Sequence, residues 1–80
     1  MKREFKIIAD LLPNNSRVLD VGCGDGTLME YLTNEKKIDV RGLELKEENV
    51  TTCIKKGLSV IEGNAETELN QFPDKSFDYV

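Results

Sequence analysis

Residues 18–28 read Val-Leu-Asp-Val-Gly-Cys-Gly-Asp-Gly-Thr-Leu, and this segment restricts the fold of the chain more than any other. An apolar, β-branched run that carries Asp20 ends in glycines at alternate positions, Gly22, Gly24 and Gly26. The pattern predicts a buried strand that stops in a loop without bulky Cβ atoms, followed by the start of a helix. A ligand can approach the backbone of such a loop closely. The alternative is a glycine-rich turn without a ligand, which many α/β proteins have.

The spacing of the glycines separates two classes of cofactor. In the dinucleotide-binding fingerprint the third glycine comes three residues after the second. Here it comes two residues after the second, and Thr27 occupies the dinucleotide position. A carboxylate at the end of a buried strand, such as Asp20, also favours a cationic ligand group over a phosphate. S-adenosylmethionine carries an ammonium and a sulfonium and no phosphate, so the segment favours this cofactor over NAD or FAD.

Length and charge limit the class of protein. The 80 residues make at most one small domain, with the hydrophobic and charged contents of a globular chain. The net charge of −4 gives no electrostatic reason to bind nucleic acid, and Lys36, Lys37 and Arg41 form the one notable basic cluster. Neither a signal peptide nor a membrane span follows the N-terminus, which predicts a cytoplasmic protein that does not enter a membrane.

The two cysteines, Cys23 and Cys53, lie far apart, and histidine is absent. We therefore expect reduced thiols and neither a metal site nor a disulfide. Cys23 has two interpretations: a small side chain that fills a tight glycine loop, or a redox or catalytic thiol. No residue is a persuasive general base, so the sequence identifies no catalytic residue. Asp78 is either structural or on the substrate side.

Helical and strand patterns alternate along the whole chain. This alternation predicts an α/β fold with a doubly wound parallel sheet whose first three strands have the order 3-2-1. The last strand is incomplete, so we expect residues 1–80 to be part of a single domain, the N-terminal half of a longer fold. The expected elements are a helix over 4–12, a strand over 17–21, a helix from 27–33, a strand over 38–45, a helix over 46–56 with Gly57 as its C-cap, a strand over 58–62, a short helix over 66–71, a turn at Pro73–Asp74 and the start of a fourth strand at 77–80.

In an open parallel sheet a ligand binds at the carboxyl ends of the strands. Glu44 ends the second expected strand, where its carboxylate can accept hydrogen bonds from both ribose hydroxyls. Leu45 can cover one face of an adenine ring, and Asn64 with Ala65, after the third strand, can meet the adenine edge. Each acid or amide also has a plainer interpretation. Glu44 can be a charge at a helix start, Asn64 a turn residue that tolerates positive φ, and Asp25 a helix cap.

Several segments together resemble the methionine-biosynthesis MetW-type proteins over about residues 5–80. They are Arg17 to Leu28, Gly42 to Leu45, Glu48 to Val50, Cys53-Ile54, Gly57 to Gly63, and Phe72 to Val80. The resemblance implies a Rossmann-like fold of the class I S-adenosylmethionine-dependent methyltransferase type, with strand order 3-2-1-4 and continuing past residue 80. It also implies an association with homoserine O-acyltransferase in methionine biosynthesis, and it does not imply a methyl acceptor.

Roles carry over from that resemblance position by position. Asp20, Gly22, Gly24 and Gly26 line the methionine moiety of the cofactor, with Cys23 inside the same loop, and Glu44 meets the ribose. The sequence departs from the family pattern at two places. Asn64 stands where the family usually has aspartate, which weakens an expected adenine contact. Lys46 stands where a helix-capping acid is usual, a loss worth about 1 kcal/mol.

The leading hypothesis is therefore a MetW-type S-adenosylmethionine-binding protein that acts with homoserine O-acyltransferase, with or without methyl transfer. The alternative is an ordinary methyltransferase that acts on a small-molecule substrate. A dinucleotide-dependent oxidoreductase is a third hypothesis, and the glycine spacing and Asp20 count against it. We expect the 80 residues alone to be inactive.

Overall fold

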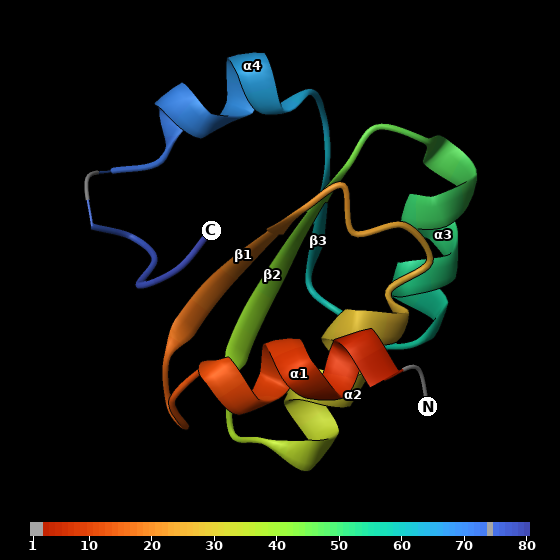
Figure 1. The fold of residues 1–80 in the computed structure, drawn as a ribbon. Helices are drawn as coiled ribbons and strands as arrows, with labels where there is room; N and C mark the ends of the chain where they lie inside the picture. The colour runs from red at the N-terminus through yellow and green to blue at the C-terminus, as the bar shows by residue number, and fades with distance from the viewer. Residues whose placement is uncertain (1–2, 74) are drawn as a thin grey trace.

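The computed structural model describes residues 3–73 and 75–80, in which helices alternate with the strands of one parallel sheet (Figure 1). The predicted α/β class is confirmed. The elements are α1 (Arg3–Leu11), β1 (Arg17–Val21), α2 (Thr27–Glu35), β2 (Asp39–Glu44), α3 (Glu47–Lys55), β3 (Val60–Glu62), α4 (Ala65–Glu68) and a turn of 3₁₀ helix, Leu69–Gln71.

The sheet has the order β1-β2-β3, with both pairs parallel. The predicted 3-2-1 order is thus found, because each crossover carries a helix and places the next strand beside the last. In register, Asp20 lies opposite Gly42 and Glu44 lies opposite Glu62. All three strands point their carboxyl ends to the same edge of the sheet.

Where the fourth strand is expected, one parallel bridge joins Val18 and Tyr79. That bridge lies on the side of β1 away from β2, but a single bridge is not a strand, so position 4 of the predicted order stays a prediction. The predicted turn before it includes Asp74, which lies outside the described residues. Ser76 N donates to Pro73 O at 3.2 Å across that turn.

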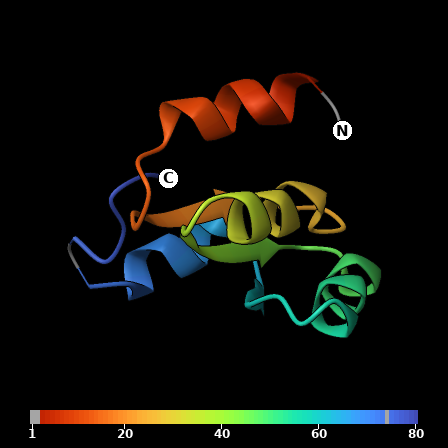
Figure 2. The same cartoon turned by 90° about the horizontal axis from the view of Figure 1, so that it is seen from below.

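The two faces of the sheet bury different residues because side chains alternate along a strand. On one face, Val18 and Val40 join the buried cluster that α1, α2 and α3 cover, which includes Met29, Leu32 and Cys53. On the other face, Leu19 and Leu43 lie beneath the segment that follows β3. Figure 2 shows α1 and α4 on opposite sides of the sheet. None of the helices in the described residues is long and apolar enough to span a membrane.

The element boundaries differ from the sequence expectations mainly at β3. The strand begins at Val60 and not at Leu58. Gly57 has φ +78°, and Leu58 N donates to Cys53 O at 3.0 Å, which closes the C-terminus of α3. Gly57 was predicted as the C-cap, but the C-cap is Lys56 and Gly57 is the residue after it. The short helix expected over 66–71 is divided into α4 and the 3₁₀ turn.

Candidate functional site

The glycine loop follows β1 and is held by β2. Gly22 N and Cys23 N both donate to Leu43 O, at 2.7 and 3.3 Å. Gly22 and Gly24 have φ +70° and +61°, and a Cβ added to either would meet no atom within 4 Å. The backbone at these two positions therefore borders open space, as a loop that a ligand approaches requires.

Gly26 lies in a different environment from Gly22 and Gly24. A Cβ at this position would lie 2.5 Å from Leu58 Cδ1 and 2.9 Å from Cys53 Sγ. The absence of a side chain here serves packing between the loop and α3. Asp25, next to it, accepts hydrogen bonds at Oδ1 from Thr27 N (3.1 Å) and Thr27 Oγ1 (2.7 Å). Its carboxylate thus stabilises the start of α2, as the plainer interpretation predicts.

Cys23 points into the protein. Its side chain is buried, and its Sγ would lie 2.7 Å from a Cβ added to Gly42. Burial, followed by the neighbouring Cys53 thiol, raises the pKa of Cys23 to about 12. A buried thiol that stays protonated is a poor nucleophile. These observations favour the interpretation of Cys23 as a residue that fills the inside of the loop.

Glu44 connects the glycine loop to α3. Its carboxylate, on a residue only 7% exposed, accepts hydrogen bonds from Gly24 N (3.0 Å), Lys46 N (3.1 Å) and Asn49 Nδ2 (3.0 Å). The Asn49 amide and then Gly24 N hold the pKa of Glu44 below its usual range. Lys46 is the N-cap of α3 and makes no side-chain cap bond. Glu44 therefore also serves the helix start, as its alternative interpretation proposes.

Asp20 is half-buried at the end of β1, near Glu44. Burial, and then the Glu44 carboxylate, raise the pKa of Asp20. Among residues 3–73 and 75–80, neither of these carboxylates takes part in an ion pair within 4 Å. Two carboxylates close together at the carboxyl edge of a sheet repel each other in the ligand-free protein. A bound cation would reduce that repulsion.

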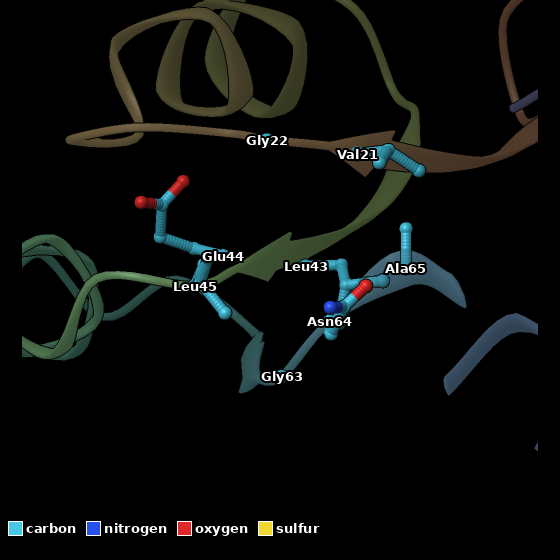
Figure 3. Close-up of a pocket in the computed structure, with 8 residues that line it drawn as sticks. All are labelled: Val21, Gly22, Leu43, Glu44, Leu45, Gly63, Asn64 and Ala65. Atoms are coloured by element: carbon cyan, nitrogen blue, oxygen red, sulfur yellow. The ribbon is translucent and has the colours of Figure 1, made fainter. Parts of the chain in front are cut away.

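A pocket opens beside Glu44 at the carboxyl ends of the strands (Figure 3). Its volume is about 210 Å³. Pockets for complete small ligands measure about 300–1,000 Å³, so this one suits a single ring or group of a ligand. Its lining residues are Val21, Gly22, Leu43, Glu44, Leu45, Gly63, Asn64 and Ala65.

The pocket brings together several of the predicted site residues. Glu44, Leu45, Asn64 and Ala65 all line it, and Leu45 is 67% exposed. The plainer interpretation of Asn64 was a turn residue that tolerates positive φ, but its φ is −95°. Its Oδ1 instead accepts from Glu66 N at 2.8 Å as the N-cap of α4. Its amide NH₂ is the group that remains for a ligand.

Sequence reasoning missed the apolar floor of the pocket and one polar contact. Val21 and Leu43 form that floor. They are the residues that flank Asp20 and Glu44 in their strands, so the alternation of strand side chains is a signal for them. Asn49 was missed because it reaches Glu44 from the second half of the first α3 turn, across five residues of sequence. Asp20, Cys23, Gly24 and Gly26 do not line this pocket.

A parallel sheet in this order, with a glycine loop after β1 and an acid at the end of β2, defines the Rossmann-like fold of class I S-adenosylmethionine-dependent methyltransferases. A methyltransferase structure from Archaeoglobus fulgidus is similar to it, with TM-score 0.71 and 28% identity, over 92% of this chain and 36% of that one. A second, from Thiobacillus denitrificans in complex with S-adenosylhomocysteine, has TM-score 0.77 and 18% identity, over 98% of this chain and 34% of that one, and supports the fold.

The family model described as methionine biosynthesis protein MetW matches residues 2–80, and the chain belongs to that family. A curated relative from Rhodopirellula baltica, named bifunctional methionine biosynthesis protein MetXA/MetW, is 31% identical over 81 residues. The match covers 91% of this chain and 13% of the relative. The chain therefore spans a small part of that relative and about a third of the solved structures that resemble it.

Proposed function

We propose that this chain forms the S-adenosylmethionine-binding part of a MetW protein. The observation that carries the proposal is the pair of acids, Asp20 and Glu44, which form no ion pair within 4 Å in the described residues and lie beside an apolar pocket. In the proposal Asp20 faces the ammonium of the methionine moiety, and Glu44 accepts from the ribose. Leu45, Asn64 and Ala65 surround the adenine.

The residues present fit such a ligand. Gly22 and Gly24 leave open space beside their Cα atoms, in which the methionine moiety can lie against the backbone. Cys23 and Gly26 belong to the proposed site indirectly, because they pack the inside of the same loop. The apolar lining and the small volume of the pocket suit an adenine ring. The Asp20 and Glu44 carboxylates would repel the negative charges of a diphosphate.

When bound, S-adenosylmethionine supplies a methyl group activated by its sulfonium. The residues of this chain bind and orient it and keep the Glu44 carboxylate ionised for hydrogen bonding. None of the three titratable side chains at the proposed site is a good general base, because in the proposal Asp20 is paired with the ligand's ammonium, Cys23 is buried with a high pKa and Glu44 is held by its donors. We propose that any acceptor side, and any methyl transfer to a small molecule, belongs to other parts of a longer fold.

A calorimetric titration of the full-length protein tests the cofactor. We expect heat on addition of S-adenosylmethionine or S-adenosylhomocysteine, and none with NAD. Asp20→Asn is the informative variant, and Glu47→Gln on the exposed start of α3 is its matched control. Binding of NAD alone, or equal binding of the nucleosides by wild type and Asp20→Asn, would contradict the proposed site.

The proposed biological role is that of a partner of homoserine O-acyltransferase. Its support is the curated relative, whose name joins MetXA and MetW in one protein. Co-purification of the full-length protein with the acyltransferase of the same organism, and assay of that enzyme with and without it, test the role. Absence of both association and effect would leave the alternative, a methyltransferase that acts on a small molecule independently.

A further inference from the structure

The donors around the Glu44 carboxylate are distributed unevenly between its two oxygens. Oε1 accepts from Gly24 N alone, at 3.0 Å. Oε2 accepts from both Lys46 N, at 3.1 Å, and Asn49 Nδ2, at 3.0 Å. Each carboxylate oxygen has about two lone pairs for hydrogen bonding. Oε2 is therefore saturated by the protein, whereas Oε1 keeps one acceptor position for a ligand.

Asn49 is the one side chain among these donors. The amides of Gly24 and Lys46 belong to the main chain, so any residue other than proline supplies them. The Asn49 amide depends on its side chain, which is half-buried on α3 five residues after Glu44. In Figure 3 the Glu44 carboxylate extends toward the loop that carries Gly22, and Glu44 is one of the residues that line the pocket.

We infer that Asn49 determines how many ribose hydroxyls Glu44 can accept hydrogen bonds from. By occupying Glu44 Oε2, the Asn49 amide leaves room for one ribose hydroxyl, which Oε1 accepts. The second hydroxyl finds no acceptor on Glu44 while Asn49 is in place. Asn49 is thus a positioning residue that sets specificity for one hydroxyl of the diol, and the inference rests on the proposed function, in which Glu44 faces the ribose.

The test compares S-adenosylhomocysteine with its 2′-deoxy and 3′-deoxy analogues on the full-length protein, by calorimetric titration. In the wild type, loss of one hydroxyl weakens binding about tenfold, as expected for a hydrogen bond to a charged group, and loss of the other weakens it less than about twofold. In Asn49→Leu, which has similar size and no donor, Oε2 is free. Loss of either hydroxyl then weakens binding about tenfold.

Two further variants make the comparison specific. Asn49→Ala removes the same donor with a smaller side chain and should give the same pattern as Asn49→Leu, so one folded variant suffices. Thr51→Ala, at an exposed position of the same helix, should keep the wild-type pattern. A general loosening of α3 would weaken all three ligands by the same factor and would leave their ratio unchanged.

The inference is overturned if the wild type loses affinity equally for both analogues, or if both Asn49 variants keep the one-sided preference. Those outcomes leave the proposed function intact, because S-adenosylhomocysteine itself still binds. If the wild type does not bind S-adenosylhomocysteine at all, the proposed function fails and this inference fails with it.

Discussion

At the scale of single residues, glycine is required after β1 for two separate physical reasons. Gly22 and Gly24 border open space, whereas Gly26 is packed against Leu58 and Cys53. A sequence motif treats the three as equivalent. The structure divides them into positions where a side chain would obstruct a ligand and one where it would disrupt the fold.

Gly24→Val should abolish binding of S-adenosylhomocysteine, because its side chain would project into the space proposed for the ligand. The backbone there has φ +61°, which costs a residue with a Cβ about 1–2 kcal/mol and a β-branched one more. Calorimetric titration measures the affinity, and urea unfolding measures the stability. Retained affinity in a folded variant would show that the loop is misplaced in the proposed site.

Gly26→Ala is the matched contrast for Gly24→Val. Its Cβ would lie within 3 Å of Leu58 Cδ1 and Cys53 Sγ, so we expect a loss of about 1–3 kcal/mol in the free energy of unfolding from overpacking. Affinity for S-adenosylhomocysteine, measured on the folded fraction, should fall less than in Gly24→Val. The reverse order of effects on binding would contradict the division of the glycines.

Asp20→Asn should weaken binding of S-adenosylmethionine by about tenfold or more, because a charge-assisted hydrogen bond to the ammonium is lost. The same change should not destabilise the ligand-free protein at neutral pH. Burial and Glu44 raise the pKa of Asp20 above its ordinary value of 3.8, so the folded state holds its proton more tightly than the unfolded state does. The ionised form is the unfavourable one.

The sign of the pH dependence follows from that difference. In the wild type, ionisation of Asp20 lowers the free energy of unfolding as the pH rises from about 3.8 through its folded pKa. The Asp20→Asn variant does not lose this free energy, because its amide does not ionise. Glu44, with a lowered pKa, acts in the opposite direction, and its contribution disappears as the pH falls through its folded pKa. Glu44 is present in both the wild type and Asp20→Asn. Urea unfolding from pH 3 to 7 measures the difference, and a variant less stable than wild type at pH 7 would contradict the argument.

The sequence allowed the location of the site to be predicted more fully than the use of each side chain. Glu44 and Asn64 were expected at the strand ends because parallel strands align there, and both line the pocket. Their hydrogen bonds within the protein, to Asn49 and to Glu66 N, depend on how two helices start after the strands. Such contacts are set by tertiary geometry, which a motif does not contain.

At the scale of elements, Arg17 and Asp78 form the side-chain contact between β1 and the segment 77–80. Asp78 accepts from Arg17 N at 2.8 Å and from Arg17 Nη2 at 3.2 Å. These bonds hold the pKa of Asp78 below its usual range. Of the two interpretations of Asp78, the structural one therefore has direct support. Tyr79 O next to it accepts from Leu19 N at 3.0 Å.

Asp78→Ala should weaken the attachment of the segment 77–80 to β1, because the carboxylate bonds to Arg17 are lost, while the rest of the sheet stays paired. We expect the amide of Leu19 to exchange with solvent about tenfold or more faster, because local opening then requires fewer broken contacts. Hydrogen exchange measured residue by residue checks this. Asp10→Ala, which removes an exposed pair with Lys6 on α1, is the control and should leave the Leu19 amide unchanged. Equal exchange of that amide in Asp78→Ala and wild type would contradict the prediction.

At the scale of the whole molecule, alternation of elements predicted the parallel sheet and its 3-2-1 order, since right-handed crossovers permit few alternatives. The fourth position was not predictable to the same degree. Phe77 to Val80 has the composition of a strand, but pairing needs hydrogen bonds along several residues, and the structure contains the single bridge at Tyr79. Composition predicts the tendency of a segment to form a strand. Whether a ladder of hydrogen bonds forms depends on the strands beside that segment.

Ligand binding should stabilise the whole fold, because the proposed site joins the ends of β1, β2 and β3. A ligand at about 100 times its Kd adds about 2.7 kcal/mol to the free energy of unfolding. The similar solved structures are about three times as long as this chain, since it covers 34–36% of them. For a domain of about 150–250 residues, that free energy raises Tm by about 5–10 °C.

Thermal unfolding of the full-length protein with S-adenosylhomocysteine should show this increase. NAD at the same concentration should not raise Tm, and Gly24→Val should abolish the increase with S-adenosylhomocysteine. An unchanged Tm at saturating S-adenosylhomocysteine would contradict a site built from all three strand ends.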